Sequence, residues 1–204
     1  MRCAVALEPV RAEPGEDSEQ VTQALLGEPL VVEERRCGWA RIVTTYDYGG
    51  WLRESALERG EGWFPEPRDV LPVVAALELL GAPYEWGGLT AAGIDCSGLV
   101  HIAYRTGGRR VPRDSWQQEA AGQIVPPGTE QIGDLVFYGA REQADHVAFW
   151  LPAGRVLHAT GRDGLGVVEE REPSGLVARR RGVLRLEEFR DRHGQHSARM
   201  RDTA

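Results

Sequence analysis

The spacing of hydrophobic and polar residues changes once along this chain, near residue 60. Before that point, short apolar runs alternate with turn-forming residues, which is the pattern of a small β-barrel. The expected strands are Cys3–Leu7, Leu30–Glu34, Trp39–Thr44 and Gly50–Arg53. The Gly- and Pro-rich segment that follows, residues 61–68, is expected to be a linker.

After the linker, apolar residues recur at helical spacing. The first helix is expected over Val70–Leu80, with Asp69 as its N-cap. A second helix is expected from about Cys96 to Arg105, because two glycines soon follow. A third, short helix should open at Ser115, since Ser115–Gln118 has the spacing of a capping box.

From Gly133 onward the pattern alternates as it does in β-strands. The expected strands are Asp134–Tyr138, His146–Leu151, Arg155–Ala159 and Gly166–Glu170. Helices followed by antiparallel strands indicate an α+β fold. The Arg-rich stretch from Arg179 is expected to be a solvated helix and a frayed tail. The predicted organisation is a β-barrel at 1–60, a linker at 61–68, an α+β domain at 69–190 and a tail at 191–204.

The amino-acid composition excludes several classes of catalytic site. The 204 residues carry a formal net charge of -7, and the chain contains neither lysine nor asparagine. This excludes a Schiff-base or P-loop lysine, a Ser–Lys dyad and a Cys-His-Asn triad. An acidic chain is poorly suited to nucleic acid, and its longest apolar run, about eight residues, is too short to span a bilayer. The apolar stretch at the start of the chain is interrupted by Glu8 and Pro9 and is too short for a secretory leader, so we expect a cytoplasmic protein.

Cys96 stands out among the three cysteines by its position. The run Gly93–Val100 passes from a loop into an apolar helical face, which places Cys96 in a first helical turn. The unpaired N–H groups and the helix dipole there favour an anion. They predict a lowered pKa of the Cys96 thiol and a nucleophilic thiolate. The same N–H groups are suited to stabilise an oxyanion. A buried structural cysteine is the alternative.

Two histidines are expected to meet on a β-hairpin whose turn is Pro152–Gly154. With a three-residue turn, Leu151 pairs with Arg155. His158 is then a diagonal neighbour of His146 on the same face, about 7–8 Å away. A register shifted by two residues would make the two histidines direct partners. A register shifted by one would put them on opposite faces.

Two imidazoles on one face supply a general base and a group that orients it, as in nucleophilic triads. Two unrelated polar residues on a half-exposed sheet are the alternative. A zinc site formed by Cys96, His146 and His158 is a further possibility, but a zinc ion would quench the thiolate, and no HExxH-like acid accompanies the set. We therefore expect neither a metal nor another cofactor. His101 points to another side of its helix and is given no role.

Six motifs occur in order along the second half of the chain. They are Tyr84–Gly88, Gly93–Val100, Arg113–Ser115 with Gln118, Gly133–Phe137, His146–Ala148 and Val156–Ala159. Together they resemble the NlpC/P60 cysteine peptidases, which have a papain-like core, over roughly residues 68–190. Val21–Glu28 and Gly50–Leu52 are similar to bacterial SH3-like domains. The resemblance thus implies an α+β papain-like domain preceded by an SH3-like β-barrel.

The resemblance implies roles for individual residues. Cys96 would be the nucleophile, His146 the general base and His158 the polar residue that orients it. Tyr84 is implied to lie beside the thiol and to help hold the oxyanion. Substrate contacts are implied for Asp95, Ser97, Asp114, Ser115 and Trp86. An SH3 tyrosine is implied to help close the site, and Tyr46 and Tyr48 are both candidates.

The implied reaction is hydrolysis of the bond between γ-D-glutamate and a diamino acid in peptidoglycan stem peptides that have a free N-terminal L-Ala. The diamino acid would be meso-diaminopimelate or L-lysine. The acidic chain suits small soluble muropeptides, and we expect a monomeric cytoplasmic recycling enzyme that binds neither nucleic acid nor membrane. Two other interpretations stay open: a non-catalytic muropeptide-binding module, and an acyl- or amidotransferase on the same core.

Overall fold

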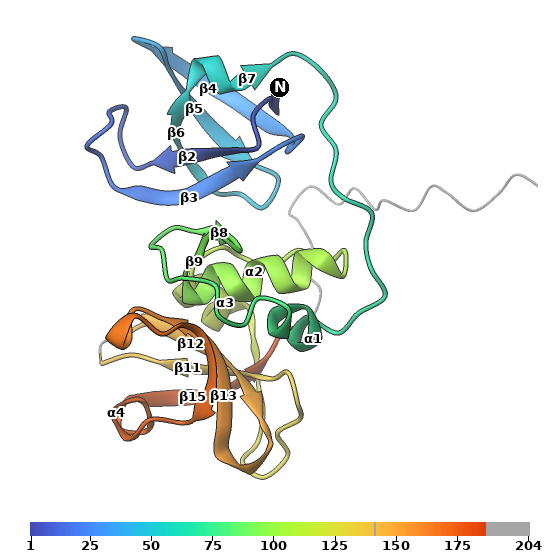
Figure 1. Cartoon of the computed structure of the whole chain (residues 1–204), viewed down its shortest axis with the longest axis vertical. Coiled ribbons are helices and arrows are strands. Elements are labelled where there is room, and N and C mark those ends of the chain that lie inside the picture. The colour runs from blue at the N-terminus through green and yellow to red at the C-terminus, as the bar shows by residue number, and fades with distance from the viewer. Residues whose placement is uncertain (141, 187–204) are drawn as a thin grey trace, which may run out of the picture.

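Three layers follow one another along the long axis of the molecule (Figure 1). They are an N-terminal β-barrel, a layer of helices, and a six-stranded sheet at the opposite end. The structure, a computed structural model, describes residues 1–140 and 142–186. The predicted tail at 191–204 lies outside the described residues. Within the described part, every helix is too short or too polar to cross a membrane.

The barrel is built from short antiparallel strands. They are β1 (Arg2–Cys3), β2 (Leu7–Arg11), β3 (Gln20–Leu25), β4 (Leu30–Arg36), β5 (Trp39–Thr44), β6 (Gly49–Arg53) and β7 (Leu57–Glu58). Five of them form a sheet of order β3-β2-β6-β5-β4, and β1 pairs with β7. The predicted strand Cys3–Leu7 is wrong, because β2 begins only at Leu7. Strand β3 was not predicted, since its buried Thr22 and Gln23 face the second domain instead of an apolar core.

The helical layer covers one face of the C-terminal sheet (Figure 1). It contains α1 (Pro72–Leu77), α2 (Cys96–Thr106) and α3 (Ser115–Ala121), and the short pair β8 (Leu89–Thr90) and β9 (Gly93–Ile94) precedes α2. Helix α1 is shorter than predicted, and its N-cap is Leu71, not Asp69, because Pro72 occupies the first turn. The capping box of α3 is formed by Asp114 and Gln117, one residue before the predicted pair.

The C-terminal sheet is antiparallel throughout, with strand order β10-β15-β11-β12-β13-β14. The strands are β10 (Gln123–Ile124), β11 (Leu135–Tyr138), β12 (His146–Leu151), β13 (Arg155–Thr160), β14 (Gly166–Arg171) and β15 (Arg180–Arg185). This confirms the α+β fold. The helix predicted from Arg179 is wrong over its described part: Val183 and Leu184 bury on opposite faces, so the segment forms β15 inside the sheet.

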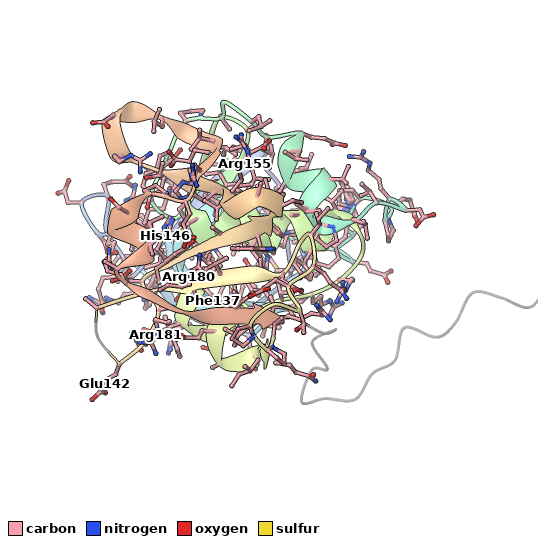
Figure 2. All side chains as sticks on the ribbon, turned by 90° about the horizontal axis from the view of Figure 1, so that it is seen from below. Phe137, Glu142, His146, Arg155, Arg180 and Arg181 are labelled. Atoms are coloured by element: carbon pink, nitrogen blue, oxygen red, sulfur yellow. The ribbon has the colours of Figure 1, made fainter. Side chains whose placement is uncertain are left out.

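Both faces of this sheet are apolar. The inner face packs against the helices through Leu135, Phe137, Val147, Phe149 and Leu157. The outer face holds Val136, Tyr138, Ala148, Val156 and Val183. Figure 2 looks onto this outer face. Leu176 of α4 (Ser174–Val177) packs against the outer cluster.

Candidate active site

Cys96 is the first residue of α2 and lies where that helix meets β12. Asp95 is the N-cap, and its carboxylate accepts a hydrogen bond from the Gly98 N–H at 2.6 Å. The sulfur of Cys96 forms backbone hydrogen bonds at Ser97 and at Val147, the residue next to His146. The predicted first-turn position of Cys96 is therefore confirmed, and its sulfur contacts the strand that carries His146.

The predicted low pKa of the Cys96 thiol is wrong. This pKa is raised to about 12, mainly by burial and in smaller part by the nearby Asp95 charge. The backbone hydrogen bonds and the Arg113 charge act in the opposite direction but are outweighed. The thiol is only 6% exposed, so desolvation of the anion exceeds the stabilisation from the helix N-terminus. The resting group is a protonated thiol, which needs a base to become a nucleophile.

The two histidines of the hairpin share one face, as predicted. Leu151 pairs with Arg155 across the Pro152–Gly154 turn, which is the register expected for a three-residue connection. Nε2 of His146 lies 2.7 Å from Nδ1 of His158. The two rings meet edge to face, with centroids 5.0 Å apart.

A third residue, Glu170, extends the hydrogen-bonded series from His146 to His158, and sequence analysis missed it. Nε2 of His158 lies 2.9 Å from Oε1 of Glu170 on β14, and Arg162 Nη2 donates to both Glu170 oxygens at 2.6 Å. The hydrogen bonds from Arg162 and His158 lower the pKa of Glu170 against the opposing effect of burial. A strand register that pairs His158 with Val168 makes Glu170 its diagonal neighbour, so a correct β13–β14 pairing would have found it.

The carboxylate fixes the tautomer of both rings. An ionised carboxylate only accepts hydrogen bonds, so His158 carries its proton on Nε2 and presents a bare Nδ1. His146 must then donate from its own Nε2, which leaves Nδ1 of His146 as an unprotonated base. Burial is the main cause that lowers the pKa of His146 to about 3, and the neighbouring His158 and the charge on Arg179 also contribute. Both rings are therefore neutral near pH 7.

Tyr84 lies beside the thiol. Its backbone bridges to Ile94, two residues before Cys96. Burial raises the pKa of the Tyr84 phenol, and the Cys96 side chain is the next cause of this rise. A Cβ at Gly161 would meet the Tyr84 ring at 3.4 Å, so a glycine at this position lets the ring lie against the loop that follows β13.

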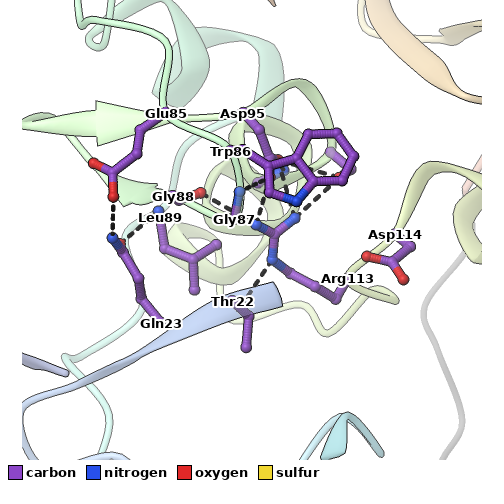
Figure 3. A network of polar contacts seen from close by, with 12 residues as sticks. Thr22, Gln23, Glu85, Trp86, Gly87, Gly88, Leu89, Asp95, Arg113 and Asp114 are labelled. Carbon is purple, nitrogen blue, oxygen red and sulfur yellow. Dashed lines mark hydrogen bonds and ion pairs between the residues drawn. The ribbon is translucent and has the colours of Figure 1, made fainter. Parts of the chain in front are cut away.

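Arg113 organises the interface between the barrel and the helices, and sequence analysis gave it no role (Figure 3). It is 1% exposed and donates to Asp95 at 2.7 and 3.0 Å, to Ser97 Oγ at 3.0 Å and to Thr22 Oγ1 of the barrel at 2.9 Å. Asp95 also accepts from the Gly87 N–H. Asp95 and Ser97 are thus held in an internal network, and their predicted contact with substrate stays a prediction.

Tyr48 is the barrel tyrosine whose hydroxyl reaches the second domain. It lies 3.1 Å from each oxygen of Asp114, the N-cap of α3. Tyr46 instead packs on His101, with ring centroids 4.4 Å apart. Ser115 is buried and donates to the Ala144 carbonyl at 3.2 Å.

Trp86 also joins the two domains. The indole donates to Glu19 of the barrel at 2.8 Å, while 60% of the residue is exposed. Next to it, Gln20 donates to the Trp86 carbonyl and to Glu85, and Gln23 both donates to Glu85 and accepts from the Leu89 N–H. These contacts fix the barrel beside the thiol-bearing helix (Figure 3).

A thiol at a helix N-terminus, set against an antiparallel sheet that carries a paired base, defines the class of papain-like thiol hydrolases. Comparison with protein families gives a match to the NlpC/P60 family at residues 81–179 and to the bacterial dipeptidyl-peptidase SH3 domain at residues 10–57. The chain therefore contains an NlpC/P60 domain, the domain of a family of cysteine peptidases, and before it an SH3 domain of the bacterial dipeptidyl-peptidase type. The predicted domain boundaries stay a prediction.

Named relatives agree with this assignment. The chain is 32% identical over 129 residues to the Bacillus cereus γ-D-glutamyl-L-lysine dipeptidyl-peptidase, a match that covers 58% of this chain and 37% of that protein. It is 36% identical over 111 residues to the Mycobacterium tuberculosis peptidoglycan endopeptidase RipB, covering 48% of this chain and 46% of that protein. The chain thus spans less than half the length of these relatives.

A solved structure shows the same fold over most of the chain. It is an NlpC/P60 family protein from Bacillus cereus, which aligns with a TM-score of 0.54 at 23% identity and covers 90% of this chain and 62% of that chain.

Proposed function

We propose that this protein is a cysteine endopeptidase that cleaves the bond between γ-D-glutamate and a diamino acid in peptidoglycan stem peptides. The observation that carries the proposal is the hydrogen-bonded pair of neutral histidines, whose first member, His146, precedes the Val147 backbone group that the Cys96 sulfur contacts. The name of the Bacillus cereus relative specifies a γ-D-glutamyl-L-lysine dipeptidyl-peptidase, and the name of RipB specifies a peptidoglycan endopeptidase.

The chemistry follows from the protonation states. Nδ1 of His146 takes the proton of the Cys96 thiol as the sulfur attacks the γ-carbonyl carbon of D-glutamate. The backbone N–H groups at the start of α2 and the Tyr84 hydroxyl stabilise the resulting oxyanion. The protonated His146 then gives its proton to the leaving amine, and a thioester forms on Cys96. Water attacks the thioester while His146 takes a water proton; the C–S bond then breaks, the γ-carboxyl product is released, and His146 returns the proton to the sulfur.

The attraction between the thiolate and the imidazolium offsets the cost of burying two charges, so a thiol that is protonated at rest can still be activated. Because the thiol and His146 are both neutral at rest, the thiolate and imidazolium form together, within a site from which bound substrate excludes water. His158 accepts the Nε2–H of His146 and stabilises the imidazolium, and the Glu170 carboxylate stabilises His158 in turn.

The substrate's free N-terminal ammonium is proposed to bind at Asp114. Arg113 pairs directly with Asp95, whereas Asp114 is influenced by the Arg113 charge without a direct ion pair and accepts a hydrogen bond from the neutral Tyr48 hydroxyl. Burial raises the pKa of Asp114, which marks a carboxylate whose charge is poorly solvated. An ammonium ion would relieve that cost through a charge-assisted hydrogen bond. The SH3 domain would thereby select peptides whose L-Ala amine is free.

We place the activity on soluble muropeptides in the cytoplasm. A formal net charge of -7 supports small peptides over the anionic cell wall as the substrate. Equal activity on intact sacculi and on tripeptide would contradict this placement.

Mass spectrometry of the products tests the proposal. L-Ala-γ-D-Glu-meso-diaminopimelate should give L-Ala-γ-D-Glu and free diaminopimelate, whereas the N-acetylated peptide should be cleaved much more slowly. Binding without any product would favour a non-catalytic module, and transfer to an added amine in preference to water would favour an acyltransferase.

A further inference from the structure

A hollow opens beside the histidine pair, next to α4. Its volume is about 440 Å³, and it is lined by His146, His158, Thr160, Arg162, Pro173, Gly175, Leu176 and Arg179. Arg162 comes from the turn after β13, and Arg179 follows α4, so two guanidinium groups approach the hollow from different segments. The residues that line the hollow within the described chain include no carboxylate.

Both guanidinium groups keep hydrogen-bond donors for a ligand. Arg162 bonds to Glu170 through Nη2, and Arg179 bonds to Asp145 through Nη2, each at 2.6 Å. These are the side-chain hydrogen bonds that the two groups make within the described residues, and they use one nitrogen of each. A guanidinium carries five N–H donors, so Nη1 of each group and Nε of Arg179 are available to a second acceptor, while Nε of Arg162 lies 4.0 Å from the Asp163 carboxylate. The two side chains are each 39% exposed, which makes them accessible from the hollow.

The positive charges act on the reacting groups. Burial is the main cause of the lowered pKa of both histidines; the Arg179 charge adds to it at His146, and the Arg162 charge adds to it at His158 against the larger opposing effect of Glu170. The hollow directly adjoins the imidazole proposed to protonate the leaving amine, and the two guanidinium groups that reach it are each paired with one carboxylate, Glu170 or Asp145.

The geometry points to this hollow as a binding site for a carboxylate of the leaving amino acid, held by Arg179 and Arg162. The inference rests on the proposed function. The acyl part of the substrate would lie toward Tyr84, Asp114 and the barrel, so the leaving residue must lie on the other side of His146. Guanidinium groups bind carboxylates through two parallel hydrogen bonds, which fixes the ligand's orientation as well as its charge.

The remaining walls fit the rest of such a residue. Pro173 and Leu176 supply apolar surface along which the methylene chain of a diamino acid could lie. The carboxylate has two sources: the α-carboxylate of a leaving residue at the peptide C-terminus, or the second carboxylate of diaminopimelate. A bare ammonium at the end of a lysine side chain would gain nothing from the two cations.

Four peptides test the inference: L-Ala-γ-D-Glu-L-Lys, L-Ala-γ-D-Glu-meso-diaminopimelate, and the α-carboxamide of each. We expect kcat/KM to fall by about tenfold when the relevant carboxylate is lost, as for a charge-assisted hydrogen bond in a half-exposed site. If the α-carboxylate is bound, amidation slows both peptides. If the second carboxylate is bound, the diaminopimelate peptides exceed the lysine peptides whether or not they are amidated.

Substitutions of arginine test whether the preference for carboxylate-bearing peptides arises in the hollow. In Arg179→Gln, the preference for the carboxylate-bearing peptide should shrink to within about twofold, because the ratio of two substrates cancels any general loss of activity. Arg155→Gln is the matched control: it removes an arginine from the far end of the same hairpin, where Arg155 pairs with Glu169, and should keep the wild-type ratio (Figure 2). Four peptides cleaved by the wild type at rates within about twofold would overturn the inference. Four uncleaved peptides would instead overturn the proposed function on which it rests.

Discussion

Nε2 of His158 lies 2.9 Å from Oε1 of Glu170, while Nδ1 of His158 lies 2.7 Å from His146. One ring thus connects a carboxylate to the proposed base. Because the carboxylate can only accept, this single contact decides which nitrogen of each histidine carries a proton.

Replacing the carboxylate should impair catalysis rather than substrate binding. We expect Glu170→Leu to lower kcat by about 10- to 100-fold with little change in KM, because His146 is then free to adopt the tautomer whose Nδ1 is protonated. Glu170→Gln should retain much more activity, since its amide oxygen still accepts from His158. Steady-state kinetics of the two variants test this, and equal losses in both would contradict the tautomer account.

The Asp114 carboxylate should control selectivity for a free N-terminus. We expect Asp114→Asn to lower kcat/KM for the free peptide by about tenfold or more while leaving the N-acetylated peptide nearly unaffected. Asparagine keeps the N-cap and can accept from Tyr48, so α3 should persist. The ratio of the two substrates is the measurement. An unchanged ratio would show that the ammonium binds elsewhere.

Arg113 should be a major contributor to stability. We expect Arg113→Met to lower the free energy of unfolding by about 3–5 kcal/mol, because it leaves the Asp95 carboxylate buried without its cation. Urea denaturation measures the change. Arg155→Met, which removes an exposed arginine, is the control and should change stability by less than about 0.5 kcal/mol.

The double variant Arg113→Met/Asp95→Asn separates the charge from the packing. It should recover part of the loss seen in Arg113→Met, since no buried charge remains unpaired. A double variant less stable than the sum of the single changes would contradict this explanation.

Stability should fall in mild acid, in part because of His101. Burial lowers the pKa of His101 to about 3, whereas an unfolded histidine titrates near 6.5, at its ordinary value. Between these values the unfolded chain binds a proton that the native chain does not, so stability is complete above about pH 6.5 and is lost as the pH falls. His101→Gln should reduce this loss by up to about 1.4 kcal/mol per pH unit. Urea denaturation at several pH values tests this, and an unchanged slope would contradict it.

Local sequence patterns predicted correctly those features of the structure that depend on contacts between residues close together in the chain. Of the registers that the sequence left open, the structure has the one expected for a three-residue turn, which puts His146 and His158 on one face. The change from loop to apolar helix likewise places Cys96 in the first turn of α2. The motif order supplies the family because it spans most of the second domain.

Other features depend on residues far apart in the chain. Arg113 acquires its role only when Thr22, 91 positions away, meets it at the domain interface. The same interface buries the polar residues of β3, so the sequence of that strand lacks the expected apolar pattern. The interface also distinguishes Tyr48, which bonds to Asp114, from Tyr46, which packs on His101. The pKa of Cys96 was mispredicted because the helix N-terminus is visible in the sequence, whereas the burial of the sulfur is not.

The most direct test of the account is the turnover of L-Ala-γ-D-Glu-meso-diaminopimelate by Cys96→Ala and His146→Ala, each checked for a wild-type melting temperature. Cys96→Ala should release no diaminopimelate above background, and His146→Ala should lose nearly as much activity, since the thiol then has no base to take its proton. Hydrolysis retained by a folded Cys96→Ala protein would contradict the mechanism.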